Sequence, residues 1–179
     1  MNITINVAGD LIARHGPDHS GFLPASIEFH GLEGIPQAGH TKVLADGTHL
    51  PAGSDRTDHV ALIDHTTGLM WLVESIGGAD GQSQQDCEKA CAALDVLGFK
   101  DWRLPTRGEL AGLVDDTRTD PAIDVSLFPR VKSRWHWTST PYAGSASSSA
   151  WFVLFDFGYV DYSLRDGDGF ALAVRRSGQ

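Results

Sequence analysis

The side chains best suited to contacting another molecule gather near the C-terminal end of the sequence, between Trp151 and Phe170. Large apolar and aromatic residues are mixed there with acidic, basic and hydroxyl residues in no strict pattern. A short, turn-rich sheet cannot bury so many large side chains, and exposed aromatic clusters usually mark an interaction site. The predicted binding residues of this stretch are Leu154, Phe157, Tyr159, Asp161, Tyr162, Ser163, Leu164, Arg165, Asp166 and Asp168.

His136 and Tyr142, which come earlier in the chain, are also predicted to belong to this surface. His136 lies between Trp135 and Trp137, so strand alternation turns its side chain away from both rings. A structural histidine in the core is the other interpretation of His136. Tyr142 is predicted to belong to the surface together with the Gly- and Ser-rich run 143–149 that follows it.

Motifs for catalysis or metal binding are weak. The sequence has no Gly-x-Ser-x-Gly elbow, no P-loop and no dinucleotide-binding glycine motif, so we expect no enzyme activity. Asp166-Gly-Asp-Gly169 is similar to the start of a calcium loop but lacks the later carboxylate of an EF-hand, so calcium is only a minor alternative and no other cofactor is expected. Cys87 and Cys91, four residues apart on one predicted helix, are predicted to be buried free thiols and not a metal site.

Composition narrows the choice of partners. The chain has 179 residues, a formal net charge of −9 and scattered lysines and arginines, which disfavours binding to nucleic acid or anionic membranes. No apolar run approaches the length of a membrane span, so no membrane insertion is expected. No signal peptide is recognisable, so display on a cell or a virion would need another component, and the localisation and oligomeric state stay open.

The order of predicted elements indicates an α+β domain. Residues 1–57 are predicted to form a strand-and-loop N-terminal extension, and residues 58–179 the main domain. Within the main domain we predict a hairpin over 59–73 with Gly68 in its turn, helices over 84–97 and 107–114, and a long ordered loop over 115–134. The predicted apolar anchors of that loop are Ile123, Val125, Leu127 and Phe128.

The last third of the chain is predicted to be an antiparallel sheet. Alternating apolar residues and Gly-rich turns predict strands over 135–140, 150–156, 159–162 and 170–175. If Trp151, Val153 and Phe155 point inward, strand alternation predicts that Phe152 and Leu154 point outward.

Several motifs occur in a characteristic order. They are Thr-Gly-Leu-Met-Trp at 67–71, Trp-Arg-Leu-Pro-Thr at 102–106, Trp-Thr-Ser-Thr at 137–140, Trp151 with Phe155 and Gly158, and Ala-Val-Arg at 173–175. Over roughly residues 58–176 the chain resembles the Lcl C-terminal domain family, which is named after a bacterial collagen-like adhesin. The resemblance implies a C-type-lectin-like fold with two helices, a long loop region and a C-terminal sheet.

The resemblance also implies a function. Some proteins with this fold are variable proteins of diversity-generating retroelements, which bind receptors on phage or cell surfaces, and the C-terminal stretch looks like theirs. Every predicted binding residue from Leu154 to Asp168 can be reached from an asparagine codon by changing its adenines. We therefore expect a binding protein for a protein or glycan ligand on a cell surface. The alternatives are a fixed-specificity adhesin or carbohydrate-binding domain and a structural tip component of a phage-like particle.

Overall fold

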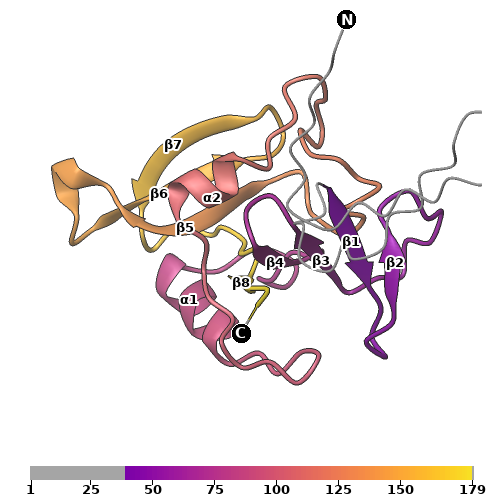
Figure 1. The fold of residues 1–179 in the computed structure, drawn as a ribbon. Helices are drawn as coiled ribbons and strands as arrows, with labels where there is room; N and C mark the ends of the chain where they lie inside the picture. Colours follow the sequence, from indigo (N-terminus) through magenta and orange to yellow (C-terminus); the bar gives the residue numbers. More distant parts are fainter. Residues whose placement is uncertain (1–38, 179) are drawn as a thin grey trace, which may run out of the picture. The chain divides into compact units, whose positions relative to one another are not determined.

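The computed structural model describes residues 39–178, which form a mixed α/β fold built mostly of antiparallel strands (Figure 1). Residues 39–178 belong to one compact unit. Within the described residues, no helix combines the length and apolarity needed to cross a membrane. The elements are β1 (His40–Val43), β2 (His49–Pro51), β3 (Ala61–Asp64), β4 (Leu69–Leu72), α1 (Gln84–Ala92), α2 (Arg107–Ala111), β5 (Trp135–Pro141), η1 (Ala143–Ser145), β6 (Ser149–Leu154), β7 (Tyr159–Leu164) and β8 (Val174–Arg176).

The first sheet has five strands in the order β2-β1-β3-β4-β8, and each strand runs antiparallel to its neighbours. β3 and β4 form the predicted hairpin, with Ala61 opposite Leu72 and Asp64 opposite Leu69. Gly68 adopts φ +67° in the turn, a conformation that only glycine reaches without strain. The predicted hairpin is confirmed.

The start of this sheet lies within the segment predicted as an N-terminal extension, residues 1–57. β1 pairs with β3 along its whole length. Lys42 of β1 is buried, and its ammonium donates to the carbonyl oxygens of Ser54 (2.7 Å) and Arg56 (3.0 Å). The compact unit therefore begins before the predicted boundary, whereas the brief strands predicted within residues 1–38 lie outside the described residues.

Helix α1 begins where predicted and ends earlier. Ser83 is its N-cap, and the Ser83 hydroxyl accepts an amide hydrogen bond from the first turn (3.2 Å). The predicted end at Leu97 is wrong, because α1 stops at Ala92. Leu97 has φ +57°, which no right-handed helix can include, and the residues after α1 fold back so that Leu94 and Leu97 pack against the core.

Helix α2 begins with the predicted capping box. The Thr106 hydroxyl accepts from the Glu109 amide (3.3 Å), and the Glu109 carboxylate accepts from the Thr106 amide (2.7 Å). Arg103 forms a bidentate pair with Glu109, and these hydrogen bonds lower the pKa of Glu109 to about 2. The predicted end at Val114 is wrong: α2 stops at Ala111, and the amides of Leu113 and Val114 bond to carbonyls three residues back instead of four.

The long loop before β5 is ordered, as predicted. Ile123 and Phe128 are buried, and Leu127 packs partly against the same core cluster. Val125 is not an anchor, since it is exposed. The Asp124 carboxylate accepts from the Ser126 amide (2.9 Å), and this turn directs Val125 to solvent.

The second sheet has three strands in the order β5-β6-β7. The predicted fourth strand, 170–175, is only partly a strand. Residues 170–173 are buried and run between the two sheets, where Phe170 bridges to His136 and Ala171 bridges to Ile76. Only β8 continues as a strand, and it joins β4 in the first sheet instead of the second.

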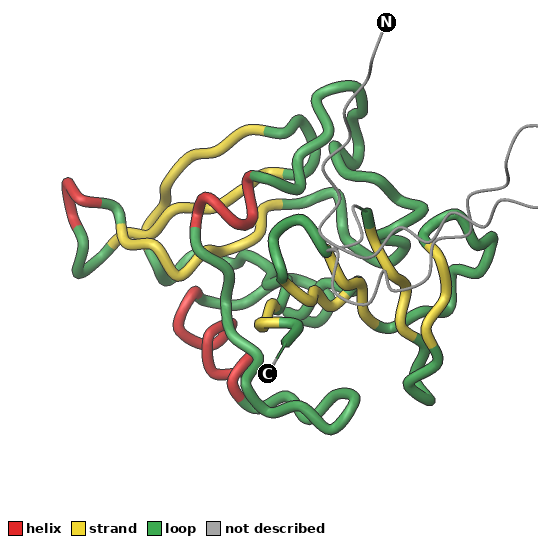
Figure 2. Tube along the Cα trace, in the orientation of Figure 1, coloured by secondary structure: helices red, strands yellow, loops and turns green. Residues whose placement is uncertain are grey.

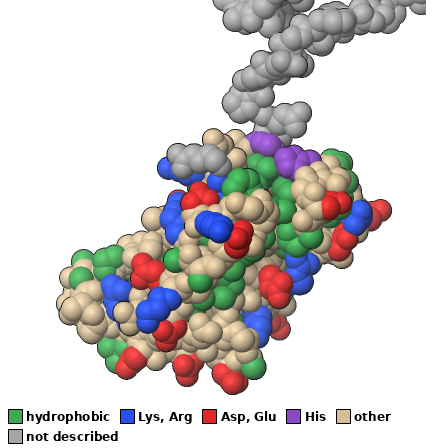
Figure 3. Space-filling model, turned by 90° about the horizontal axis from the view of Figure 1, so that it is seen from below, with side chains coloured by type: hydrophobic (Ala, Val, Ile, Leu, Met, Phe, Trp, Pro, Cys, Tyr) green, Lys and Arg blue, Asp and Glu red, His purple; other side chains and the backbone are tan. Residues whose placement is uncertain are grey.

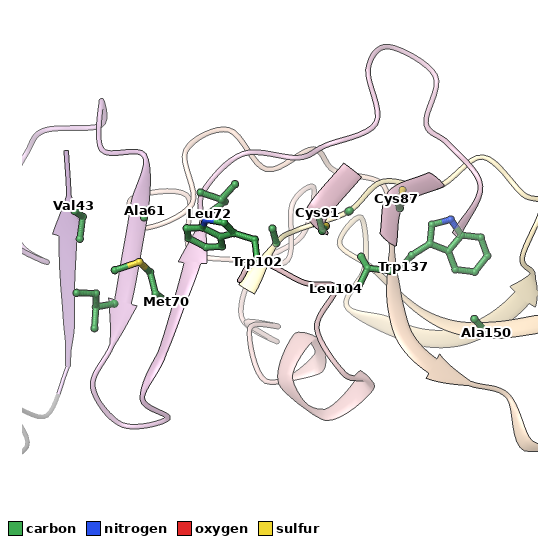
Figure 4. Close-up of a cluster of buried hydrophobic side chains, with 13 residues drawn as sticks. Val43, Ala61, Met70, Leu72, Cys87, Cys91, Trp102, Leu104, Trp137 and Ala150 are labelled. Carbon is green, nitrogen blue, oxygen red and sulfur yellow. The ribbon is translucent and has the colours of Figure 1, made fainter. Parts of the chain in front are cut away.

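The core consists of two buried clusters on opposite faces of the three-stranded sheet. One cluster includes Cys87 and Cys91 of α1 with Trp137 and extends to β3 and β4 of the first sheet (Figure 4). The other joins Val153 and residues of α2 and the long loop. The helices therefore pack on different sides of β5 and β6, as the trace in Figure 2 shows, and leave β7 at the open edge.

Both cysteines are buried and free, as predicted. Burial raises the pKa of Cys87 and of Cys91 to about 12, so both thiols stay protonated at neutral pH. The thiol of Cys87 lies 3.6 Å from the carbonyl oxygen of Gly169. These residues serve as small core side chains.

Candidate binding surface

The hairpin of β6 and β7 carries most of the exposed apolar surface. Its strands pair from Ser149 opposite Leu164 to Leu154 opposite Tyr159. Among the described residues, five large hydrophobic side chains are exposed, and four of them lie in this hairpin. Their exposed fractions are 61% for Phe157, 65% for Tyr159, 43% for Tyr162 and 59% for Leu164.

Strand alternation divides the predicted binding residues between two faces of β7. Tyr162 and Leu164 share one face with Trp151, which lies opposite Tyr162 on β6. Tyr159, Asp161 and Ser163 point to the other face, where Tyr159 and Asp161 are exposed and Ser163 is half-buried. Because β7 is an edge strand, both faces border solvent, but one flat ligand surface cannot cover them together.

A compact aromatic group supports Tyr162. The rings of Tyr142 and Tyr162 are stacked, with centroids 3.6 Å apart and an interplanar angle of 3°. The Trp151 ring meets both tyrosines edge-on, at 5.5 and 5.7 Å. Gly144 makes room for Tyr142, because a Cβ at this glycine would lie 2.6 Å from that ring. We call Tyr142, Trp151 and Tyr162 the Tyr162 cluster.

Arg107, the first residue of α2, borders the Tyr162 cluster. Its guanidinium carbon lies 4.0 Å from the centroid of the Trp151 ring, in the geometry of a cation–π contact. The Arg107 amide donates to the Thr140 hydroxyl (2.9 Å), which ties the start of α2 to β5. The backbone beneath the guanidinium is therefore fixed.

Arg107 was not among the residues predicted from the sequence, and Trp151 was predicted to point inward. Trp151 is half-exposed, whereas Val153 and Phe155 on the same face are buried as predicted. Phe152, predicted to point outward, packs edge-on against Trp135 with ring centroids 4.7 Å apart. A signal for Arg107 exists in the sequence, because it follows the capping residue of α2 and its side chain must leave the first helical turn.

The hairpin tip forms a second exposed group. Phe157 and Tyr159 have ring centroids 5.9 Å apart, and both rings are largely in solvent. Gly158 between them adopts φ +78°, and a Cβ there would lie 2.8 Å from Val114. The long loop holds the tip from below through the amide of Asp120, which donates to the carbonyl oxygen of Asp156 (2.9 Å).

Asp161 has a role at the open edge of β7. Its carboxylate accepts a hydrogen bond from the amide of Tyr162 at 2.8 Å. This bond occupies one amide that is not used in pairing with β6. Charged side chains that block an edge strand reduce edge-to-edge association between copies of a chain.

Three predicted binding residues have other surroundings than expected. His136 is fully buried, with Nε2 2.7 Å from the Ser75 hydroxyl and Nδ1 2.9 Å from the Arg134 carbonyl oxygen, so its prediction as a surface residue is wrong. The His136 side chain does point away from the two tryptophans, as strand alternation requires, but it is buried next to Phe170. Arg165 donates to Gln84 Oε1 (2.9 Å) and to the Ala146 carbonyl (3.0 Å), and thereby holds the chain after β7. Leu154 is half-buried.

The last predicted residues lie beyond β7. Asp166 and Asp168 are exposed in the turn after the strand. Gly81 approaches the backbone of Asp168 closely, since a Cβ at Gly81 would lie 2.6 Å from the Asp168 carbonyl oxygen. Within residues 39–178, no group of three or more His, Cys, Asp or Glu side chains is arranged as metal ligands would be.

Ser75 and His136 have the spacing of a nucleophile and a general base. The Ser75 hydroxyl, however, also accepts from the Lys132 amide (2.8 Å), and His136 has no contact with solvent. Burial lowers the pKa of His136 to about 4, so the imidazole is neutral at physiological pH. The pair links β5 to the segment after β4 and has no opening for a substrate.

Charges are mixed on the face that Figure 3 shows, with basic and acidic side chains interspersed and no continuous basic area. Many of the arginines are held by acidic neighbours, as Arg103 is by Glu109 and Arg118 by Asp115.

Comparison with known proteins gives one family. The model of the Lcl C-terminal domain matches residues 61–175, from the first residue of β3 to the middle of β8. No curated protein matches the chain in sequence. The match covers more than half of the chain and includes the β3–β4 hairpin, both helices and the whole three-stranded sheet, so this chain belongs to the Lcl C-terminal domain family.

Proposed function

We propose that this chain is a non-catalytic ligand-binding protein whose contact surface is the β7 strand with its flanking turns. The observation that carries the proposal is the exposure of Phe157, Tyr159, Tyr162 and Leu164 in one hairpin. An exposed side chain of this size forgoes roughly 1.5–3 kcal/mol that burial would provide. Three of them lie on the edge strand β7 and Phe157 lies in the turn before it, so a ligand that reaches around this edge would cover them.

We further propose that the fold is C-type-lectin-like. The supporting features are the pairing of β8 with β4, which brings the ends of the family region together, two short helices, and a long ordered loop before a second sheet. In this arrangement the β6–β7 hairpin is held at its base by both core clusters. The scaffold can therefore tolerate changes along β7.

Diversification by a retroelement is the finer part of the proposal. It is supported by the contrast between Val153 and Phe155, which are buried, and the exposed residues of β7, which are all within reach of an asparagine codon. The expected ligand is a protein on a cell surface.

The test is to sequence the 3′ end of the gene and its downstream flank in independent isolates. We expect a near-copy of the region encoding roughly residues 137–176, with differences at adenines and with protein changes confined to exposed positions such as Phe157, Tyr159 and Tyr162. An invariant region without a copy would reject diversification and leave a binding surface of fixed specificity.

A fixed-specificity carbohydrate-binding domain is the second candidate. It is favoured by the rings of Phe157 and Tyr159, which stand in solvent at the hairpin tip and could stack on a sugar. A glycan array decides between the two: binding that is lost in Tyr159→Ala and unchanged in Tyr162→Phe would support the carbohydrate candidate.

A further inference from the structure

Arg107 differs from most arginines of the described region. Arg103, Arg118, Arg130 and Arg175 each contact a carboxylate of the chain. No ion pair or side-chain hydrogen bond of the Arg107 guanidinium occurs within residues 39–178, although the protein as a whole carries a net charge of −9. A cation is also unfavourable in the first turn of a helix, where the helix dipole is positive. Within the described residues, the contact of the Arg107 guanidinium with the Trp151 ring therefore leaves its N–H donors without a carboxylate partner.

The Trp151 ring orients the Arg107 guanidinium. Because the guanidinium carbon lies 4.0 Å from the ring centroid, the contact occupies the face of the guanidinium and leaves its N–H donors at the rim. Such donors match the two oxygens of a carboxylate, and stacking reduces the entropy lost when they bind. Tyr162 of β7 contacts the same Trp151 ring edge-on, with ring centroids 5.7 Å apart.

We propose that Arg107 is a specificity-determining residue that binds the carboxylate of an aspartate or glutamate side chain in a protein ligand, next to an apolar contact at Tyr162 and Leu164. The inference rests on the proposed binding function and names the chemistry of one part of that surface. Arg107 lies outside the diversified stretch 154–168, so it supplies a constant contact while β7 changes.

The Tyr162 cluster favours a protein ligand over a glycan. Sugar rings bind best to an open aromatic face, but Arg107 covers Trp151, and Tyr142 and Tyr162 cover one face of each other at 3.6 Å. The exposed ring edges and the guanidinium suit an acidic side chain flanked by apolar residues. At physiological ionic strength, charges farther apart than the Debye length of about 8 Å are largely screened from each other. Distant acidic side chains of the protein therefore do not prevent a carboxylate from binding at Arg107.

The experiment is to select a library of random linear peptides, displayed on phage, against the full chain. Selected peptides are then synthesised and titrated against wild type, Arg107→Gln, Arg107→Lys and Tyr162→Ala. Arg56→Gln is the matched charge control, because Arg56 is exposed in the segment between β2 and β3 and pairs with Asp58. Circular dichroism and melting temperature show whether each variant is folded.

We expect the selected peptides to carry an aspartate or glutamate at a constant position beside apolar residues. Affinity should fall about tenfold or more in Arg107→Gln, as expected for loss of a charge-assisted pair, and should also fall in Arg107→Lys, which keeps the charge but loses the planar donors. Arg56→Gln should bind as wild type does, and an Asp→Asn or Glu→Gln change in the peptide should have no further effect in Arg107→Gln.

Peptides that depend on Tyr162 but lack an acidic residue would overturn the role of Arg107 and leave the proposed function intact. Failure to select any peptide that depends on β7 would count against both. A sulfated heparin disaccharide that binds through Arg107 more tightly than every selected peptide would overturn the protein carboxylate in favour of an anionic glycan.

Discussion

Strands β4 and β7 both carry large apolar or aromatic side chains, but β7 also contains Asp161 and Ser163, and the two strands have opposite surroundings. All four residues of β4 are buried between β3 and β8, whereas β7 has one neighbour and every residue of it is exposed or half-exposed. Apolar side chains in β4 therefore stabilise the fold, and those in β7 remain available for contact. The comparison teaches that position in the sheet, and not hydrophobicity, separates scaffold from candidate surface.

The strongest test of this comparison is Trp71→Ala in β4. Trp71 is buried in the cluster that includes Leu110 and Phe155, and truncating a buried tryptophan costs about 3–5 kcal/mol. Because the whole fold has a stability of roughly 5–15 kcal/mol, this variant should be close to unfolding. Denaturant unfolding measures the loss, and a cost below about 1 kcal/mol would contradict the assignment of β4 as scaffold.

Acid should destabilise the fold through the buried His136 of β5. Burial lowers the pKa of His136 to about 4, below the ordinary value of 6.5 that applies in the unfolded chain. The folded state therefore binds fewer protons, so stability is complete above pH 6.5 and falls as the pH drops toward 4, by roughly 3 kcal/mol.

His136→Gln should flatten this part of the pH profile. His59 contributes to the same window, because burial lowers its pKa too, so a residual slope is expected. The Glu109 carboxylate has a pKa near 2 and loses its contribution only at lower pH. Urea unfolding between pH 7 and pH 4 gives the slope, and an unchanged slope in His136→Gln would mean that folding does not shift the pKa of His136.

Gly158→Ala tests how tightly the β7 hairpin is held at its tip. Gly158 adopts φ +78°, and a Cβ there would also lie 2.8 Å from Val114. Gly98 has the same φ but nothing within 4 Å of its added Cβ, which makes Gly98→Ala the matched control. Backbone strain costs about 1 kcal/mol in both, and Gly158→Ala should lose about 1 kcal/mol more. Equal losses would show that Val114 moves aside.

The sequence predicted local features better than the relation between segments. Ser83, Gly68 and the Thr106–Glu109 capping box are local signals, and each has the predicted role. The ends of both helices were placed too late, because apolar residues such as Leu94 continue the helical period although the chain has already turned. Periodicity alone does not distinguish a helix from a turn that packs against the same core.

The sequence predicted which region carries the candidate surface, but it did not predict correctly which side chains of that region point to solvent. Alternation assigned His136 to the surface, but it could not reveal that Phe170 and Ser75 close over that side of β5. The same limit applies to Arg165, whose partners Gln84 and Ala146 are distant in sequence. Contacts between distant segments depend on the tertiary arrangement and leave no pattern in neighbouring residues.

Tyr159→Ala is expected to have the smallest effect on stability and a large effect on binding. Tyr159 is 65% exposed, and a surface substitution of this kind changes the free energy of unfolding by less than about 0.5 kcal/mol. Tyr162→Ala should cost slightly more, about 1 kcal/mol, because it removes the stacked contact with Tyr142. Titration with peptides selected on the wild-type chain measures binding, and the melting temperature of each variant measures its stability.

A loss of binding at unchanged melting temperature would place the two tyrosines on the contact surface, because the scaffold would be intact. A large drop in stability would show instead that β7 contributes to the core, and the contrast with β4 would then disappear. Val160, which lies on the same face of β7 as Tyr162 but packs against the buried cluster, gives the internal reference. Val160→Ala should destabilise the fold more than Tyr159→Ala, since burial and not size decides the cost.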